Sequence, residues 1–377
     1  MPMRWAWAEI DLEALAHNVE VLRRSSGGAA LWAVVKADGY GHGAVTVARA
    51  ALAAGVDGLC VALVQEARAL RAADVDASIL VLSEQPAEQA GDAVAAGVVS
   101  TVVSAAGVSA VERAAASAGV RHAVHLKVDT GMHRMGCAPE EAVDLARQVV
   151  ASESLRLDGV FTHLATADQP GHAAVGLQVD RFDAVLEQLR AAGVDPGVVH
   201  LANSAATLAI PGAGRDAVRV GIALYGLSPG PGVDAMATDL RPVMSLHARV
   251  SRVQRAAAGD GVSYGWTHVL RRPTTLATVP IGYADGVPRR LSAVGGEVLV
   301  GGVRRPIVGV VTMDQLVVDV GDLTVRVGDP VVLIGRQGGD EITATEWADR
   351  LGTIGYEIVC GVSARVPRVT GVVDSTA

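Results

Sequence analysis

Cysteine, lysine and aromatic residues are all scarce in this chain. Its three cysteines, Cys60, Cys137 and Cys360, are isolated and form no CxxC pair, which argues against a disulfide framework and against a zinc site. No metal site is expected from any other spacing. Aromatic residues make up 3% of the sequence, and only two of the 32 basic residues are lysines, Lys36 and Lys127. Residues used this sparingly are candidates for chemistry.

Basic runs and long uncharged apolar runs are also missing. The net charge is −8, and no basic stretch is longer than a pair of arginines, which argues against nucleic acid or an anionic membrane as the main partner. The N-terminal stretch has no apolar run of signal-peptide length, and no transmembrane span is indicated. We therefore expect a cytoplasmic protein that acts on a small molecule, with no nucleic-acid or membrane partner.

What the chain does contain is a repeated pattern of short apolar runs followed by alanine-rich helical segments. Half of the 377 residues are hydrophobic, which is enough for a sizeable core. Several helical segments end in glycine, as a helix C-cap does. Eight strand-like runs occur, within residues 31–39, 58–63, 78–84, 98–104, 122–131, 157–168, 198–206 and 217–226. This alternation predicts an α/β fold with a (β/α)₈ TIM-type barrel.

The pattern changes after about residue 235. Valine- and threonine-rich strands are joined there by Gly, Asp and Pro turns, and one helical piece, TATEWADRLG, interrupts them. The turn-rich stretch GLSPGPGVD at residues 226–234 marks the expected boundary. The sequence therefore predicts a barrel domain at 1–235, whose first ~10 residues pair with the second domain, and a mostly β domain at 236–377.

Lys36 is the most informative single residue, because arginine serves wherever positive charge alone is needed in this chain. Arginine does not deprotonate in proteins, so a lysine is required where a neutral amine must act as a nucleophile or base. Catalytic groups of a barrel collect at the carboxyl ends of its strands. The chemistry-bearing residues at or near the ends of the predicted strands are Lys36, Lys127, Arg134, His163, Asn203, Ser204, Arg219, Gly221 and Ile222.

Two of these groups predict a phosphate site. The stretch ANSAAT after the seventh run offers the Ser204 hydroxyl, and RVGIALYG in the eighth offers backbone amides beside Gly221. Barrels often bind phosphate with the loops after strands seven and eight. A phosphate-bearing cofactor that faces a lysine on strand one is best matched by pyridoxal 5'-phosphate, whose aldehyde condenses with an amine.

The positions of the tyrosines suggest a functional role, whereas those of most histidines do not. All five tyrosines lie in glycine-containing stretches, where a phenol can donate a hydrogen bond or exchange a proton; they are Tyr40, Tyr225, Tyr264, Tyr283 and Tyr356. Several histidines show no ligand spacing and are expected to be ordinary core or surface residues: His17, His122, His125, His172 and His247. His42 and His200 lie within motifs, and their role there can be either functional or structural.

The motifs taken together resemble those of the alanine racemase family. The resemblance runs nearly end to end and is carried by AVVKADGYGHGA, KVDTGMHRMG, FTHLATAD, HLANSAAT, RVGIALYG, GVSYGWTH, PIGYADG, TMDQ and IGYEIVCGVSARVPRV. The family has an N-terminal barrel and a C-terminal β domain and uses pyridoxal phosphate. The resemblance implies interconversion of L-alanine and D-alanine by two bases, which supplies D-alanine for bacterial peptidoglycan.

The resemblance also implies roles for particular residues. Lys36 holds the cofactor covalently and is the base on one face, while Tyr264 is the base on the other face and comes from the second subunit of a head-to-tail homodimer. Further residues implied to bind the cofactor are Tyr40, His163, Asn203, Ser204, Arg219, Gly221, Ile222 and Tyr356. Residues implied to orient or admit the substrate are Arg134, Met313 and Tyr283. Lys127 resembles a lysine that is often carbamylated in the family.

Three departures from the usual family motifs leave local loop geometry open. His133 stands where an amide is common, Val220 where a proline is common and Gly355 where an asparagine is common. Three other readings also stay open: a serine or broad-spectrum racemase of the same fold, a decarboxylase of similar architecture, and a non-enzymatic pyridoxal-phosphate carrier. The carrier has no need of a second domain bearing Tyr264.

Overall fold

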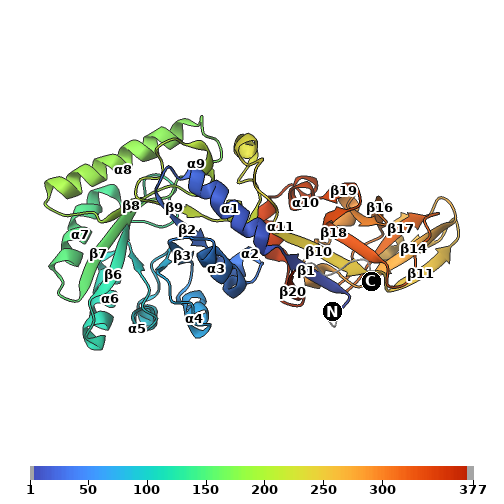
Figure 1. Ribbon diagram of the computed structural model, residues 1–377, viewed down its shortest axis with the longest axis horizontal. Helices are drawn as coiled ribbons and strands as arrows, with labels where there is room; N and C mark the ends of the chain where they lie inside the picture. The colour runs from blue at the N-terminus through green and yellow to red at the C-terminus, as the bar shows by residue number, and fades with distance from the viewer. Residues whose placement is uncertain (1–3, 372–377) are drawn as a thin grey trace. The chain divides into compact units, whose positions relative to one another are not determined.

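A computed structural model of the chain describes residues 4–371 and divides it into two compact units (Figure 1). The barrel unit comprises Leu15–Gly39 and Ala44–Arg241. The β-rich unit comprises the described residues up to Ala14, the short segment Tyr40–Gly43 and the chain from Pro242 onward. Four residues that follow the first barrel strand thus belong to the β-rich unit.

The barrel unit contains eight parallel strands, one for each of the eight predicted runs. They are β2 (Ala30–Val34), β3 (Gly58–Val61), β4 (Ile79–Val81), β5 (Ser100–Val102), β6 (His122–Lys127), β7 (Leu155–Phe161), β8 (Val198–His200) and β9 (Ala217–Val220). Their order is β4-β3-β2-β9-β8-β7-β6-β5. A parallel bridge between Leu80 and Val99 joins β4 to β5 and closes the ring. The predicted TIM-type barrel is therefore confirmed.

Helices follow the strands and pack on the outside of the barrel (Figure 1). They are α1 (Leu12–Ser25), α3 (Ala44–Ala53), α4 (Val64–Ala72), α5 (Ala90–Ala95), α6 (Ala105–Ala118), α7 (Ala142–Ala151), α8 (Ala173–Ala191) and α9 (Ser204–Ala209). Helix α6 shows why these segments are helical. Ser104 caps its N-terminus by accepting the Gly107 amide, Gly119 ends it in the left-handed conformation, and Val108 and Val111 are buried.

The β-rich unit is built on a ten-stranded sheet. Its strands are β1 (Ala6–Ile10), β10 (Met244–Arg249), β11 (Arg252–Ala256), β14 (Thr274–Val279), β15 (Glu297–Val300), β16 (Val303–Val308), β17 (Leu316–Gly321), β18 (Pro330–Gln337), β19 (Asp340–Ile342) and β20 (Arg368–Thr370). Strand β1 pairs antiparallel with β10 and parallel with β20. The mostly β character predicted for this part of the chain is confirmed.

Two small elements of the β-rich unit matter for the site. A short hairpin of β12 (Gly261–Val262) and β13 (His268–Val269) carries Tyr264 at its turn. Two helices, α10 (Ala344–Leu351) and α11 (Gly355–Gly361), follow β19. The sequence indicated only the first of them, because α11 has a glycine at each end and no amphipathic repeat long enough to identify it.

Candidate active site

Lys36 stands at the carboxyl end of β2, directly after the buried residue Val35. Lys36 begins the short element α2 (Lys36–Tyr40). The four residues after the lysine have φ angles of 51°, 52°, 62° and 52°, so they form a left-handed turn. The left-handed conformation costs an L-residue other than glycine roughly 1–2 kcal/mol. Gly39 is the one residue of the four that adopts it freely. The lysine is thus held at the start of a turn that its own sequence does not favour.

Tertiary hydrogen bonds stabilise that turn. The Glu66 carboxylate on α4 accepts the backbone amide of Ala37 at 2.7 Å and those of Ala62 and Leu63 at 2.8 and 3.1 Å. It therefore ties the residue after Lys36 to the end of the neighbouring strand β3. The sequence carries only a weak signal for Glu66, a glutamate in the first turn of a helix that can reach back to an N-cap amide, and its role was not predicted.

Arg219 lies inside the barrel on β9 and is 4% exposed. Its guanidinium is 2.6 Å from Nδ1 of His200 and 3.3 Å from Nδ1 of His163, and it donates to the Thr162 carbonyl at 2.8 Å. No carboxylate forms an ion pair with it in residues 4–371. Burial lowers the pKa of Arg219 to about 10, so the side chain is a buried cation at neutral pH, and the groups that accept its hydrogen bonds are neutral.

Lys127 and Arg219 share one aromatic neighbour. The Lys127 ammonium is 5.3 Å from the centroid of the Phe161 ring, and the Arg219 guanidinium is 5.1 Å from it. Both distances are within the range of cation–π contacts. The Lys127 Nζ also donates to the Leu82 carbonyl at 3.1 Å. Burial, followed by the charges of Arg219, Arg134 and Lys36, lowers the pKa of Lys127 to about 8.

His163 follows β7 and is neutral at pH 7. Its pKa lies well below the ordinary value, because burial and then the charge of Arg219 disfavour the imidazolium. An arginine cannot accept a hydrogen bond, so Nδ1 of His163 is the acceptor in the contact with Arg219. The ring proton is therefore on Nε2, which leaves a donor on the side away from Arg219.

The predicted phosphate residues meet at the ends of β8 and β9. Ser204 is the first residue of α9, and the Asn203 side chain caps that helix by accepting the Ala206 amide at 3.0 Å. The buried Ser204 hydroxyl accepts the amide of Gly221 at 2.8 Å. Ile222 begins the short 3-10 helix after Gly221 and is also buried. These residues form a compact set of amides and a hydroxyl beside Arg219.

The remaining predicted residues of the β-rich unit lie in two places. The rings of Tyr40 and Tyr356 are 6.2 Å apart, centroid to centroid. Tyr283 lies in a turn whose next residue, Ala284, donates its amide to the Met313 carbonyl at 3.0 Å. Tyr283 is 41% exposed and Met313 is 52% exposed. Tyr40 and Tyr356 are therefore neighbours, and the turn that contains Tyr283 is hydrogen-bonded to the loop that contains Met313.

Tyr264 is the most exposed of the large hydrophobic residues in the described chain, at 74%. Its hairpin is anchored by Val262 and Leu270, which pack with Leu276 and Val308. Ser263, just before it, has a φ of 62° and donates its hydroxyl to the Val310 carbonyl at 2.7 Å. An anchored hairpin thus presents an exposed phenol. Arg134, on the loop after β6, is exposed as well.

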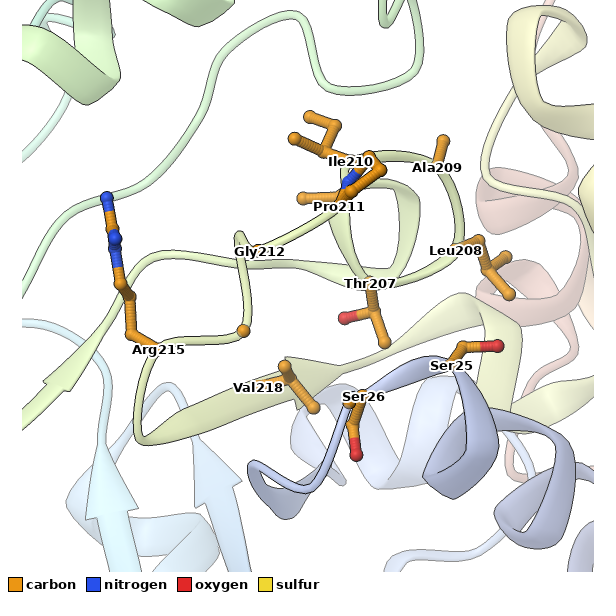
Figure 2. Close-up of a pocket in the computed structure, with 13 residues that line it drawn as sticks. Ser25, Ser26, Thr207, Leu208, Ala209, Ile210, Pro211, Gly212, Arg215 and Val218 are labelled. Carbon is orange, nitrogen blue, oxygen red and sulfur yellow. The ribbon is translucent and has the colours of Figure 1, made fainter.

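A separate cavity of about 560 Å³ lies between the end of α1, helix α9 and the loop before β9 (Figure 2). Figure 2 shows Ser25, Ser26, Thr207 and Val218 around it, with Arg215 at one side. Arg215 is paired with Asp183 at 2.9 Å. None of the predicted site residues lines this cavity, so it is not the candidate active site.

No helix in residues 4–371 is long and apolar enough to cross a membrane. Over the same residues, no group of three or more His, Cys, Asp or Glu side chains is placed to hold a metal ion. The polar groups at the carboxyl end of the barrel include two lysines and a buried arginine beside neutral histidines, a combination that suits an anionic organic ligand.

The fold and these residues define an enzyme built from a TIM-type barrel and a β-rich domain. The sequence profile of the alanine racemase N-terminal domain matches residues 10–229, and that of the C-terminal domain matches residues 243–370. The chain belongs to the alanine racemase family, whose members are isomerases.

Individual alanine racemases are similar to this chain over nearly its whole length. The chain is 50% identical to the alanine racemase of Symbiobacterium thermophilum, with 98% of each chain covered, and 46% identical to that of Thermobifida fusca, with 98% and 99% covered. It is similar to the crystal structure of alanine racemase from Streptomyces lavendulae, with a TM-score of 0.92, 41% identity and full coverage of both chains. The Bacillus anthracis enzyme with bound L-Ala-P gives a TM-score of 0.93 at 40% identity, with 99% and 96% covered.

Proposed function

We propose that this enzyme interconverts L-alanine and D-alanine with pyridoxal 5'-phosphate as its cofactor. The observation that carries the proposal is Arg219, a buried cation with neutral partners, in a barrel whose first strand ends at Lys36. A guanidinium held in this way can donate a hydrogen bond to the unprotonated ring nitrogen of the cofactor. The amine of Lys36 at the strand end can condense with the cofactor's aldehyde.

The residues present fit this cofactor. Lys36 would hold it covalently, Arg219 would donate to its ring nitrogen and His163 would lie beside the ring. The amides near Gly221 and Ile222, together with Ser204 and the helix cap Asn203, would hold its phosphate, and the phenols of Tyr40 and Tyr356 would add donors. When bound, the cofactor would stabilise negative charge at the α-carbon of the amino acid.

Two bases of the chain would move the α-proton. The neutral amine of Lys36 takes or returns it on one face, and the Tyr264 phenolate does so on the other. A tyrosine has an ordinary pKa of about 10, so bringing it to about 7 requires roughly 4 kcal/mol of stabilisation of the phenolate. We propose that the Nε2 proton of His163, polarised by Arg219, donates to that phenolate.

The substrate carboxylate would be oriented by Arg134 and by the backbone near Met313, with Tyr283 narrowing the entrance. Lys127 would carry a carbamate, formed when its neutral amine attacks carbon dioxide and releases a proton to solvent. The lowered pKa of Lys127 supplies that neutral amine near pH 8. The resulting anion would balance the charges of Arg134 and Arg219.

We propose that the protein is a head-to-tail homodimer, and the exposure of Tyr264 supports this arrangement. Its phenol is exposed on an anchored hairpin, and we propose that Tyr264, Met313 and Tyr283 complete the site of the partner subunit. In this proposal residues 1–235 form the cofactor-binding domain and residues 236–377 the domain that reaches the partner. The product D-alanine would supply peptidoglycan synthesis in the cytoplasm.

The test uses the purified full-length protein incubated with pyridoxal phosphate. We expect absorbance typical of the lysine-bound cofactor and conversion of L-alanine or D-alanine to the same mixture of both, measured by chiral chromatography. Lys36→Arg keeps the charge and removes the neutral amine, so it should lose both signals. A coloured protein that leaves L-alanine optically intact would be a carrier and not a racemase. Faster conversion of L-serine would instead identify a serine or broad-spectrum racemase.

A further inference from the structure

Two histidines extend the hydrogen bonding of Arg219 through the barrel interior. Nδ1 of His200 is 2.6 Å from Arg219, and Nδ1 of His125 is 2.9 Å from Nε2 of His200. His200 is completely buried and His125 is 2% exposed. The three side chains come from β9, β8 and β6 and form one continuous chain of hydrogen bonds.

Arginine sets the direction of every hydrogen bond in this chain. Its guanidinium can only donate, so Nδ1 of His200 accepts and the ring proton of His200 is on Nε2. That proton is donated to Nδ1 of His125, whose own proton is therefore on Nε2. Burial is the main cause of the lowered pKa of both imidazoles, which brings His125 to about 4 and keeps both rings neutral.

The backbone is shaped around His125. The pairing of β6 with β7 shifts by one residue between Val124 and His125, so that His125 faces Gly159 and not Asp158. A Cβ atom on Gly159 would lie 2.6 Å from Cε1 of His125. The same Cβ would lie 2.6 Å from the Val198 carbonyl oxygen, so the glycine accommodates both the imidazole ring and the neighbouring strand β8.

The far side of His125 borders a cavity of about 300 Å³ that is also lined by Trp32, Ser78 and Asp158. A buried water needs about 30 Å³ and two to four polar partners. The cavity is therefore large and polar enough for water that accepts the Nε2 proton of His125. The chain of hydrogen bonds thus begins at a cation and ends at a residue that lines a polar cavity.

We propose that His125 is a positioning residue: it accepts the Nε2 proton of His200 and so holds that ring with Nδ1 directed at Arg219, where two aligned neutral imidazoles, and no carboxylate, accept the hydrogen bond of the cation. This inference rests on the proposed role of Arg219 opposite the cofactor ring nitrogen. A carboxylate in place of His200 would form an ion pair with the guanidinium and compensate its charge at that contact. Two aligned imidazoles accept the hydrogen bond there without adding a negative charge.

The test compares three variants of the full-length, cofactor-loaded protein with the wild type. His125→Phe keeps the ring volume and removes the acceptor for His200. His125→Asn retains an acceptor oxygen near the position of Nδ1. The matched control is His122→Phe, because His122 lies on the same strand and is a buried neutral histidine, but it contacts Ser100 and not the arginine chain.

Nitrogen NMR of histidine-labelled protein reads the tautomers directly, without reference to activity. We expect the wild type to show His200 and His125 as neutral rings protonated on Nε2. In His125→Phe the His200 signals should change, kcat should fall about tenfold, because a buried donor loses its partner, and transamination should rise relative to racemisation. His125→Asn should recover most of both properties, and His122→Phe should keep the wild-type ratio.

The outcomes separate this inference from the proposed function. A wild-type protein with the expected tautomers that leaves alanine optically unchanged would refute the function and support the hydrogen-bond chain. An active racemase whose His200 nitrogen signals and reaction ratio are the same in His125→Phe as in the wild type would overturn the role of His125. Equal effects of His125→Phe and His122→Phe on the ratio would also overturn it, because they would indicate a general packing effect.

Discussion

Replacing Lys127 by methionine should make the protein's stability less dependent on pH. Lys127 is 6% exposed, and burial lowers its pKa from 10.5 to about 8. The protonated side chain is thus disfavoured in the folded state by about 3 kcal/mol relative to the unfolded chain. Methionine has a similar length and carries no charge, so the Lys127→Met variant does not bear this cost.

The sign of the effect follows from the two protonation states. Below pH 8 the lysine is protonated both folded and unfolded, and the folded state bears the full cost. As the pH rises through 8, the folded protein loses the proton while the unfolded chain keeps it until about pH 10.5, so stability rises with pH. Between pH 7 and pH 9 the unmodified wild type should gain about 1.3 kcal/mol relative to Lys127→Met.

The assay is urea unfolding of both proteins in buffer freed of carbon dioxide, at one protein concentration and at several pH values. The loss of the donor to the Leu82 carbonyl in the variant is independent of pH, so the slope isolates the titration of Lys127. Added bicarbonate should stabilise the wild type, because carbamylation removes the buried cation, and should leave the variant unchanged. A wild-type-to-variant difference that is flat between pH 7 and pH 9 would refute this account.

Three further substitutions test other parts of the site. Arg219→Glu should raise transamination relative to racemisation, because a carboxylate favours a protonated ring nitrogen; product analysis with L-alanine checks this, and an unchanged ratio contradicts it. Tyr264→Phe should lower racemisation at least a hundredfold but retain exchange of the α-proton of one enantiomer in D₂O, and equal loss for both enantiomers would contradict a one-face role. Ala37→Gly should stabilise the fold by about 1 kcal/mol, because glycine adopts φ of 51° without cost, whereas Ala50→Gly within α3 should destabilise it by a similar amount.

The sequence predicted the parts of the fold that local patterns determine. Eight apolar runs separated by glycine-capped helices identified the barrel, and the valine-rich strands after it identified the β-rich domain. The position of Lys36 at a strand end also followed, because the apolar run stops at that residue. These features depend on which residues are buried and on where each strand or helix ends, and both can be inferred from the type and spacing of neighbouring residues.

The parts that the sequence did not predict depend on contacts between distant segments. The left-handed turn after Lys36 contains alanine and tyrosine, which disfavour that conformation, and it depends in part on Glu66, which lies 29 residues away from Ala37. His125 could not be distinguished from other core histidines, because its partner His200 is 75 residues away in the chain. Only the closed barrel places them next to one another.

The charges in the barrel explain why lysine is kept at two positions in a chain that otherwise uses arginine. Arg219 stays charged at neutral pH because its pKa remains at about 10, and the neutral histidines beside it accept its hydrogen bonds without compensating its charge. Burial, and after it the charge of Arg219, lowers the pKa of Lys127 to about 8, so the residue that remains a cation helps to make its neighbour available as a neutral amine. An arginine at either lysine position would keep its proton, so it could not supply the neutral amine that the proposed reactions of Lys36 and Lys127 require.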